Sequence, residues 1–185
     1  MEHKQVRADH DARTITVYQA YSPAVAEPAL AAGRLVPPFR PDRMTWIKPS
    51  FLWTMYRCGW AGKPDQERVL AITVTREGFE SALRSAVLSS ERAERKPEVR
   101  VQWDPERDLH LNPLAHRAIQ VGLAGSASHR YVREWTVGLR DVTHLAHAVH
   151  GLVRRGRTAE ASALLPPERP YPLPPDVAER LGATG

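Results

Sequence analysis

The chain has 185 residues, which is the length of one ordinary domain and enough to bury a core. Its apolar fraction of 42% and charged fraction of 25% are those of a globular protein, and no stretch approaches the 18 apolar residues that a membrane-spanning helix needs. The only cysteine, Cys58, excludes a disulfide or a cysteine-based zinc site within one chain. We expect a protein of the reducing cytoplasm without a membrane partner, because the charged N-terminal stretch also lacks the apolar region of a secretory signal.

The chain carries 26 Lys and Arg residues against 21 Asp and Glu residues, for a net charge of +5. Such an excess is typical of proteins that bind phosphate-rich partners such as DNA or RNA. It is equally typical of a composition biased towards Arg and Ala, and composition alone does not separate the two interpretations.

The first element is a strand at residues 14–21, where Thr, Ile, Val and Tyr dominate. Alternation places Ile15, Val17 and Gln19 on one face.

A helix follows this strand. Ser22 and Pro23 are typical of an N-cap and a first helical residue, and Gly33 stands where a helix-ending glycine belongs. The chain then leaves extended through residues 35–39, because a residue before a proline disfavours the helical region.

The most aromatic stretch spans residues 44–60. It predicts a short strand at 44–47, a turn, and a helical segment with Phe51 and Met55 on one face. Its mixture of aromatic and basic side chains could stack a base and pair with phosphate. The alternative is a tryptophan-rich core with basic residues at its rim.

Residues 67–75 are the clearest strand of the chain. Thr75 is a suitable N-cap for the next helix, in which Phe79, Leu83, Ala86 and Val87 recur at helical spacing.

The second half predicts further strands at residues 99–104, 116–125 and 134–139, and a helix from residue 143 to 157. We expect one domain over residues 1–165 and a proline-rich tail over 166–185 that lies extended or is partly disordered. This order of elements favours an α+β fold, in which helices flank a mixed or antiparallel sheet.

No nucleotide-binding glycine motif and no G-x-S-x-G elbow is present. His144, His147 and His150 recur at intervals of three, but no acidic residue accompanies them, so a solvated polar face is favoured over a metal site. Glu134 opens an apolar strand beside Arg133. It is a solvated strand-end residue, the partner of an arginine, or a catalytic group aimed into a cleft, and its position leaves these three roles open.

Three longer blocks carry a resemblance to a known family: "RADHDARTITVYQAYSPAVAEPAL", "PPFRPDRMTWIKPSFLWTMYRCGWAGKPDQERVLAITVTREGFE" and "HRAIQVGLAGSASHRYVREWTVGLRDVT". They resemble the signature blocks of a bacterial and fungal domain-of-unknown-function family, number four-two-nine-one. The resemblance covers about residues 7–165 and is specific to the family, but the family itself implies no activity.

A more distant similarity is to the ADP-ribosyltransferases, in the branch that modifies DNA bases. "VYQAYSPAVAEPALAAGRLVPPF" resembles their first NAD-binding block, in which an aromatic-led strand carries His or Arg and a glycine ends the following helix. "WIKPSFLWTMY" resembles the second block, and "SASHRYVREWTV" resembles the third, in which a helix runs into a strand led by the catalytic glutamate. The similarity implies a split mixed β-sheet that clamps NAD in an extended cleft.

Residue by residue, the similarity implies that Glu134 stabilises the oxocarbenium-like sugar and holds a ribose hydroxyl. Gln19 stands where the first block has His or Arg, a role that Arg7 could take, and Ser50 is the nearest equivalent of a Ser-Thr-Ser triplet. The implied NAD-binding residues, which would stack on nicotinamide or a base, hold the pyrophosphate or replace the block residues, are Arg7, Tyr18, Gln19, Tyr21, Lys48, Ser50 and Tyr56.

Three functions remain as hypotheses. The leading one is an ADP-ribosyltransferase-like domain that uses NAD, with nucleic acid as a candidate acceptor. The second is a non-catalytic nucleic-acid or nucleotide-binding module on the same scaffold. The third is a hydrolase or phosphotransferase acting on a nucleotide.

Overall fold

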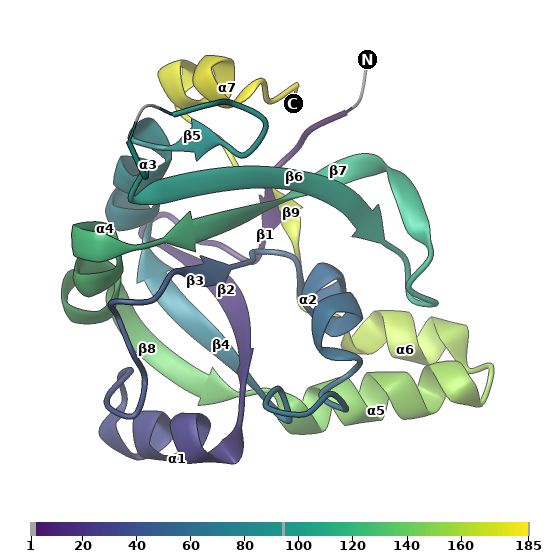
Figure 1. The fold of residues 1–185 in the computed structure, drawn as a ribbon. Coiled ribbons are helices and arrows are strands. Elements are labelled where there is room, and N and C mark those ends of the chain that lie inside the picture. Colours follow the sequence, from purple (N-terminus) through teal and green to yellow (C-terminus); the bar gives the residue numbers. More distant parts are fainter. Residues whose placement is uncertain (1–2, 94, 185) are drawn as a thin grey trace.

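The computed structural model describes residues 3–93 and 95–184, which form an α+β fold with three sheets and helices packed around them (Figure 1). The strand orders are β2-β4-β8, β3-β7-β6-β5 and β1-β9, and all pairs are antiparallel except β5 with β6. The strands are β1 (Arg7–Ala8), β2 (Thr14–Tyr21), β3 (Thr45–Ile47), β4 (Arg68–Thr75), β5 (Val87–Leu88), β6 (Val99–Arg107), β7 (Pro113–Leu123), β8 (Thr136–Asp141) and β9 (Arg169–Pro170). The helical elements are α1 (Pro23–Ala32), α2 (Phe51–Cys58), α3 (Arg76–Arg84), α4 (Gly125–Arg130), the π-helical turn η1 (Tyr131–Trp135), α5 (Thr143–Arg154), α6 (Thr158–Leu164) and α7 (Pro175–Leu181).

Strand β2 organises the interior because both of its faces are covered. Ile15 and Val17 enter the larger apolar core, which lies between the sheets and α1, α3 and α7. Tyr18 points the other way, into a smaller core with Phe51 of α2 and residues of α5 and α6. The strands predicted at residues 14–21 and 67–75 are confirmed, and they pair with each other along their whole length.

The two larger sheets meet where β2 approaches β3. These strands belong to different sheets, and an isolated bridge joins them, in which the Tyr18 N–H donates to the Lys48 carbonyl at 2.8 Å. The mixed strand orientation expected from the sequence is confirmed by the parallel pairing of β5 with β6 among otherwise antiparallel pairs.

The first helix begins after Ser22 and at Pro23 as predicted, although the Ser22 side chain makes no cap hydrogen bond. Gly33 ends α1 with φ of 66°, a left-handed conformation that glycine adopts without steric cost. The Ser50 hydroxyl accepts the Trp53 N–H at the start of α2, and the Thr75 hydroxyl accepts the Gly78 N–H at the start of α3. These bonds satisfy backbone donors that have no partner within the helix.

Two boundaries differ from the prediction. Helix α3 ends at Arg84, and Val87 pairs with β6 instead of continuing the helix. The apolar spacing of this segment fits either period, and pairing with the neighbouring strand decides it. Strand β8 begins at Thr136, so Glu134 does not lead a strand but lies in η1.

The proline-rich C-terminal segment is not the extended or disordered tail that we expected. Within residues 166–184, β9 lies beside β1 and pairs with it (Figure 1). Helix α7 buries Val177 and Leu181 in the larger core. Prolines occupy the edge strand β9 and the first turn of α7. At these positions the backbone N–H that proline lacks would have no hydrogen-bond partner within the strand pair or the helix. The backbone N–H of Thr184 donates to the Lys4 carbonyl at 2.8 Å, so the two ends of the chain lie side by side.

None of the helices in residues 3–93 and 95–184 is both long and apolar enough to cross a membrane.

Substitution of Leu181 tests whether α7 is part of the core. Leu181→Ala removes a fully buried side chain and should lower the free energy of unfolding by about 2–4 kcal/mol. Leu164→Ala is the matched control, because Leu164 is 43% exposed and its truncation should cost about 0.5 kcal/mol or less. Chemical denaturation measures both values, and equal stabilities of the two variants would contradict the packing of α7.

Candidate functional site

The N-terminus of α2 holds a buried carboxyl group from β6. The Ser50 hydroxyl donates to Glu106 Oε1 at 2.8 Å, and the same oxygen accepts the Arg107 N–H at 2.8 Å. Glu106 is only 7% exposed. It follows Pro105 at an irregularity in the pairing of β6 with β7, where β7 carries the extra residues.

A second carboxyl group, from the C-terminal segment, reaches the same helix end. Glu168 Oε1 accepts the Phe51 N–H, the first donor of α2, at 2.6 Å. Arg7 Nη2 donates to the Glu168 carbonyl at 3.3 Å, while Arg7 Nη1 donates to Gln5. Residues of β1, α2, β6 and the C-terminal segment therefore meet at one polar cluster, which we call the carboxyl cluster and define as Arg7, Ser50, Glu106 and Glu168.

The two carboxyl groups resist ionisation. Burial, opposed by the hydrogen bond from the Phe51 N–H and assisted by the charge of Glu106, raises the pKa of Glu168 to about 8. Burial also raises the pKa of Glu106, against the lowering influence of the Arg107 N–H, Ser50 and the charge of Arg7. Glu168 therefore holds a proton at neutral pH, whereas Glu106 has the donors that favour its charged form.

Tyr18 adds a polar group beside this cluster. Its hydroxyl is buried and has no hydrogen-bond partner among residues 3–93 and 95–184. Burial raises the pKa of Tyr18, and the charges of Glu168 and Asp9 raise it further, so these acids lie close enough to act on the hydroxyl. A buried donor without a protein partner is energetically costly, and a polar ligand atom could satisfy it.

A hollow of about 170 Å³ lies at the division between the sheets, lined by Gln19 and Tyr21 of β2, Thr45 of β3, and Lys48. Gln19 is held from both sides: its amide donates to the Thr45 hydroxyl at 2.6 Å and accepts from the Tyr131 hydroxyl at 2.8 Å. The side chain of Gln19 thus has a structural role at the wall of the hollow.

Lys48 adds a positively charged side chain to this hollow, and its surroundings change its pKa. Burial and the charge of Arg57, opposed by Cys58 and Asp104, together lower the pKa of Lys48 to about 8. Its Nζ lies 3.5 Å from the Trp46 carbonyl. At neutral pH Lys48 is mostly protonated and is suited to holding a phosphate.

Tyr56 lies beyond the carboxyl cluster and is 37% exposed. Its ring stacks on Trp53 with centroids 5.2 Å apart, and the guanidinium of Arg107 lies 3.7 Å from the centre of the Tyr56 ring. This stack presents an aromatic surface and a positive charge next to Glu106.

Glu134 has a different setting from the one we expected. It lies in η1, its side chain is 58% exposed, and its carboxylate pairs with Arg130 at 3.2 Å. Its neighbours Tyr131 and Trp135 belong to the larger core, whereas Tyr18 belongs to the smaller one. The π-helical turn explains this setting, because it delays the start of β8 and leaves Glu134 beside Arg130 at the surface.

The structure therefore brings together Arg7, Ser50 and Tyr18 at one place and Gln19, Tyr21 and Lys48 at the adjoining hollow, with only Pro49 between Lys48 and Ser50 in the chain. Sequence reasoning missed Glu106 and Glu168. A proline within a strand is typical of an irregularity in the strand pairing, so Pro105 could have drawn attention to this end of β6. The proline-rich surroundings of Glu168 gave no comparable signal.

The three histidines of α5 do not form a metal centre. In the part of the chain that the structure describes, no three His, Cys, Asp or Glu side chains are grouped so that they could share an ion. His150 instead stacks on Trp60, with ring centroids 5.3 Å apart and the planes nearly parallel.

The raised pKa of Glu168 predicts the pH dependence of stability. The folded protein holds a proton that the unfolded chain releases above the ordinary value of 4.5, so stability should fall as the pH rises from about 4.5 to about 8. Glu168→Gln keeps an acceptor for the Phe51 N–H and should remove on the order of 2–4 kcal/mol of this decline. Lys48 acts in the opposite direction above pH 8, where its lowered pKa lets stability recover.

Urea denaturation of both proteins at intervals between pH 4.5 and 8 measures this difference. Parallel profiles for the wild type and Glu168→Gln would contradict the buried, protonated state of Glu168.

Comparison with known proteins gives one match and one negative result. The model of the family described as "Domain of unknown function (DUF4291)" matches residues 5–171, a range that includes every member of the carboxyl cluster and the residues that line the hollow. No curated protein matches the chain. The protein therefore belongs to the DUF4291 family.

Proposed function

We propose that this protein is an ADP-ribosyltransferase-like enzyme that uses NAD, with Glu106 rather than Glu134 as its catalytic carboxylate. The observation that carries the proposal is the 2.8 Å hydrogen bond from Ser50 to Glu106, next to a hollow lined by Gln19, Tyr21 and Lys48. Residues of the first and second blocks thus adjoin a buried carboxyl group, although that group comes from β6 and not from the third block.

The chemistry needs one ionised carboxylate near the sugar. When the bond between nicotinamide and ribose breaks, its electron pair leaves with nicotinamide and positive charge develops on the ribosyl group. A fixed carboxylate stabilises this charge, and an acceptor then forms the new bond and loses its proton. Nicotinamide leaves as a neutral molecule and needs no acid, so the important property of Glu106 is its charge.

The surrounding groups suit the rest of NAD. Lys48 and Arg7 supply positive charge for the pyrophosphate, and the buried Tyr18 hydroxyl is available as a donor. NAD is larger than the 170 Å³ hollow. A second hollow of about 270 Å³ shares Tyr21, Met44 and Thr45 with the first and adds Arg40 and Arg43, so the two together offer an elongated basic site.

One observation favours a second candidate function. The stack of Arg107, Tyr56 and Trp53 combines a positive charge with an aromatic face at the surface, which is the combination that binds single-stranded nucleic acid. It would serve either as the acceptor site of the enzyme or as the contact surface of a non-catalytic binding module.

Replacement of Glu106 tests the catalytic assignment. Glu106→Gln keeps the size of the side chain and an acceptor for Ser50 but removes the charge, so nicotinamide release should fall about 100- to 1,000-fold. NAD affinity should change little, because the positive charge on the sugar develops only in the transition state. Glu134→Gln is the matched control, which should leave release intact and change stability by about 0.5 kcal/mol or less.

The measurements are nicotinamide release with and without DNA or RNA, NAD binding by calorimetry, and the melting temperature of each protein. Equal release by the wild type and Glu106→Gln would remove Glu106 from the mechanism. NAD binding without release by the wild type, with every acceptor tested, would favour the binding module.

Nucleic-acid binding has its own test. If the surface formed by Arg107 and Tyr56 binds phosphates, the affinity of the protein for single-stranded DNA or RNA should fall steeply between 50 and 200 mM salt, because binding releases counterions. Tyr56→Ala should weaken binding by about 1–3 kcal/mol through the lost stacking, whereas Tyr56→Phe keeps the ring and should not. Fluorescence titrations at the two salt concentrations measure both effects. Absence of binding at low salt would mean that the excess of positive charge reflects a biased composition and not nucleic-acid binding.

A further inference from the structure

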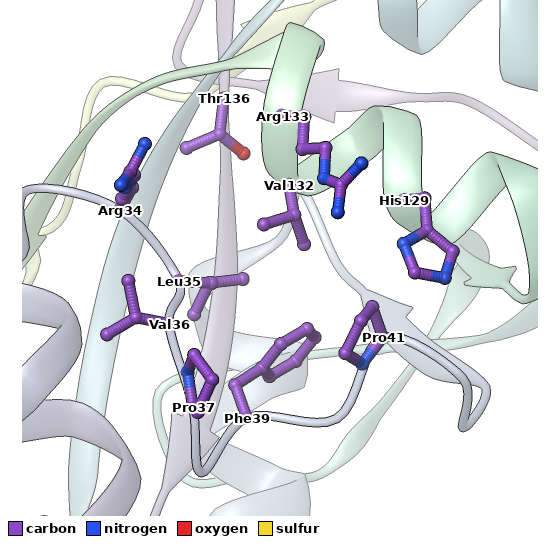
Figure 2. Close-up of a pocket in the computed structure, with 10 residues that line it drawn as sticks. All are labelled: Arg34, Leu35, Val36, Pro37, Phe39, Pro41, His129, Val132, Arg133 and Thr136. Atoms are coloured by element: carbon purple, nitrogen blue, oxygen red, sulfur yellow. The ribbon is translucent and has the colours of Figure 1, made fainter.

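The largest of the hollows described lies between the segment that follows α1 and the turn η1, away from the carboxyl cluster. Its volume is about 430 Å³, within the range of small-molecule sites. Gly33 redirects the chain after α1 with its left-handed backbone, so that residues 34–41 form one wall. The lining residues are Arg34, Leu35, Val36, Pro37, Phe39, Pro41, His129, Val132, Arg133 and Thr136 (Figure 2).

The lining is apolar apart from its cationic side chains. Leu35 and Phe39 are buried members of the larger core, and Val132 faces them from η1 (Figure 2). The Thr136 hydroxyl donates to the Tyr131 carbonyl at 2.8 Å, which leaves few polar groups for the edge of a nucleobase. An apolar ligand body suits this lining better than a base.

The cations of this hollow are not neutralised by the protein. In residues 3–93 and 95–184, no carboxylate pairs with Arg34 or Arg133. The neighbouring acids are already engaged, because Glu134 pairs with Arg130 and Asp42 pairs with Arg40. No acid lines the hollow. Its charge is therefore available to an anion.

The backbone on this side of the hollow is unusual and well supported. Val132 and Arg133 lie in a π-helical turn, a form that is rare and occurs frequently at functional sites. The Tyr131 hydroxyl bonds to Gln19, and the Tyr131 carbonyl accepts both the Thr136 hydroxyl and the Thr136 N–H. These hydrogen bonds hold the turn against β2 and the start of β8. They therefore fix the backbone that carries Arg133.

We propose that this hollow is a binding site for a small organic anion with an apolar body, an aryl or short-chain carboxylate or phosphate. The body packs on Leu35, Phe39 and Val132, and the anionic head takes hydrogen bonds from Arg133, whose guanidinium points towards His129 (Figure 2). This site is separate from the NAD site proposed above, so a test of one site does not decide the other.

Calorimetry of the full chain with defined probes tests the site. Phenyl phosphate and 4-phenylbutyrate supply the two head groups on an aryl body, benzyl alcohol supplies the body without charge, and inorganic phosphate supplies the charge without the body. At least one of the aryl anions should bind at least tenfold more tightly than either incomplete probe, and comparison of the two identifies the preferred head group.

Variants locate the binding. Arg133→Gln should weaken the aryl anion about tenfold or more, and Val132→Trp should abolish binding by filling the hollow. Arg155→Gln, at the end of α5, removes an exposed positive charge elsewhere and should leave the affinity unchanged. Glu106→Gln should also leave it unchanged, which separates this site from the proposed NAD site.

Three results would overturn the proposal. They are absence of aryl-anion binding by the wild type, equal affinity of the wild type and Arg133→Gln, and tighter binding of AMP in the same hollow than of either aryl anion. Melting temperatures accompany each titration. If Val132→Trp does not fold, the exposed Arg133→Gln decides the test.

Discussion

The unpaired N–H groups at the start of α2 are the point on which the arrangement of the site depends. The Phe51 N–H binds Glu168, the Trp53 N–H binds Ser50, and Ser50 in turn binds Glu106. A helix must satisfy these donors. Here the Phe51 N–H is satisfied by a residue 117 positions away, and Ser50, which satisfies the Trp53 N–H, donates in turn to a carboxyl group 56 positions away. The helix end therefore fixes the C-terminal segment and the end of β6 relative to each other.

This connection explains why the C-terminal segment belongs to the fold. Glu168 directly precedes β9, so its bond to α2 places that strand against β1, and the chain continues through Tyr171 to α7. The hydrophobic contribution comes from Tyr171, Val177 and Leu181, which are all buried in the larger core. Polar bonds at one end and apolar burial at the other thus hold a segment that has little regular structure between them.

The sequence predicts local structure well where a residue acts through its own backbone. Ser22 and Thr75 precede helices, Gly33 ends one, and both long strands of the first half have their expected bounds within one residue. Prediction from the sequence fails where contacts with distant residues decide the local structure. Val87, for example, has helical spacing in the sequence but pairs with β6 in the structure. The family was recognisable from three blocks of sequence, but those blocks contain neither Glu106 nor Glu168.

In the candidate site, too, some residues could be predicted from the sequence and others could not. Gln19, Tyr21 and Lys48 could be grouped from the sequence because they lie on two segments that the resemblance already placed together. The prediction that Glu134 opens a strand was wrong for a local reason. The pattern of "REWTVGL" is typical of one apolar strand, and only the structure shows that its first three residues complete a π-helical turn. No residue in that stretch marks the extra residue of the turn.

The two buried carboxyl groups lower the stability of the fold in the charged state, and this cost is itself an argument about function. Glu168 caps α2, and Glu106 accepts from the Ser50 hydroxyl and the Arg107 N–H, although a neutral Gln could accept from the same donors without the cost of a buried charge. Structural ion-pair networks also perturb pKa values, but Glu106 and Glu168 are not neutralised by a close ion pair within the described residues. Arg7 lies near enough to lower the pKa of both carboxyls, yet its side chain donates to an amide oxygen and a backbone carbonyl. A cationic centre that approached Glu106 would supply the missing charge, and the positive sugar of NAD cleavage is such a centre.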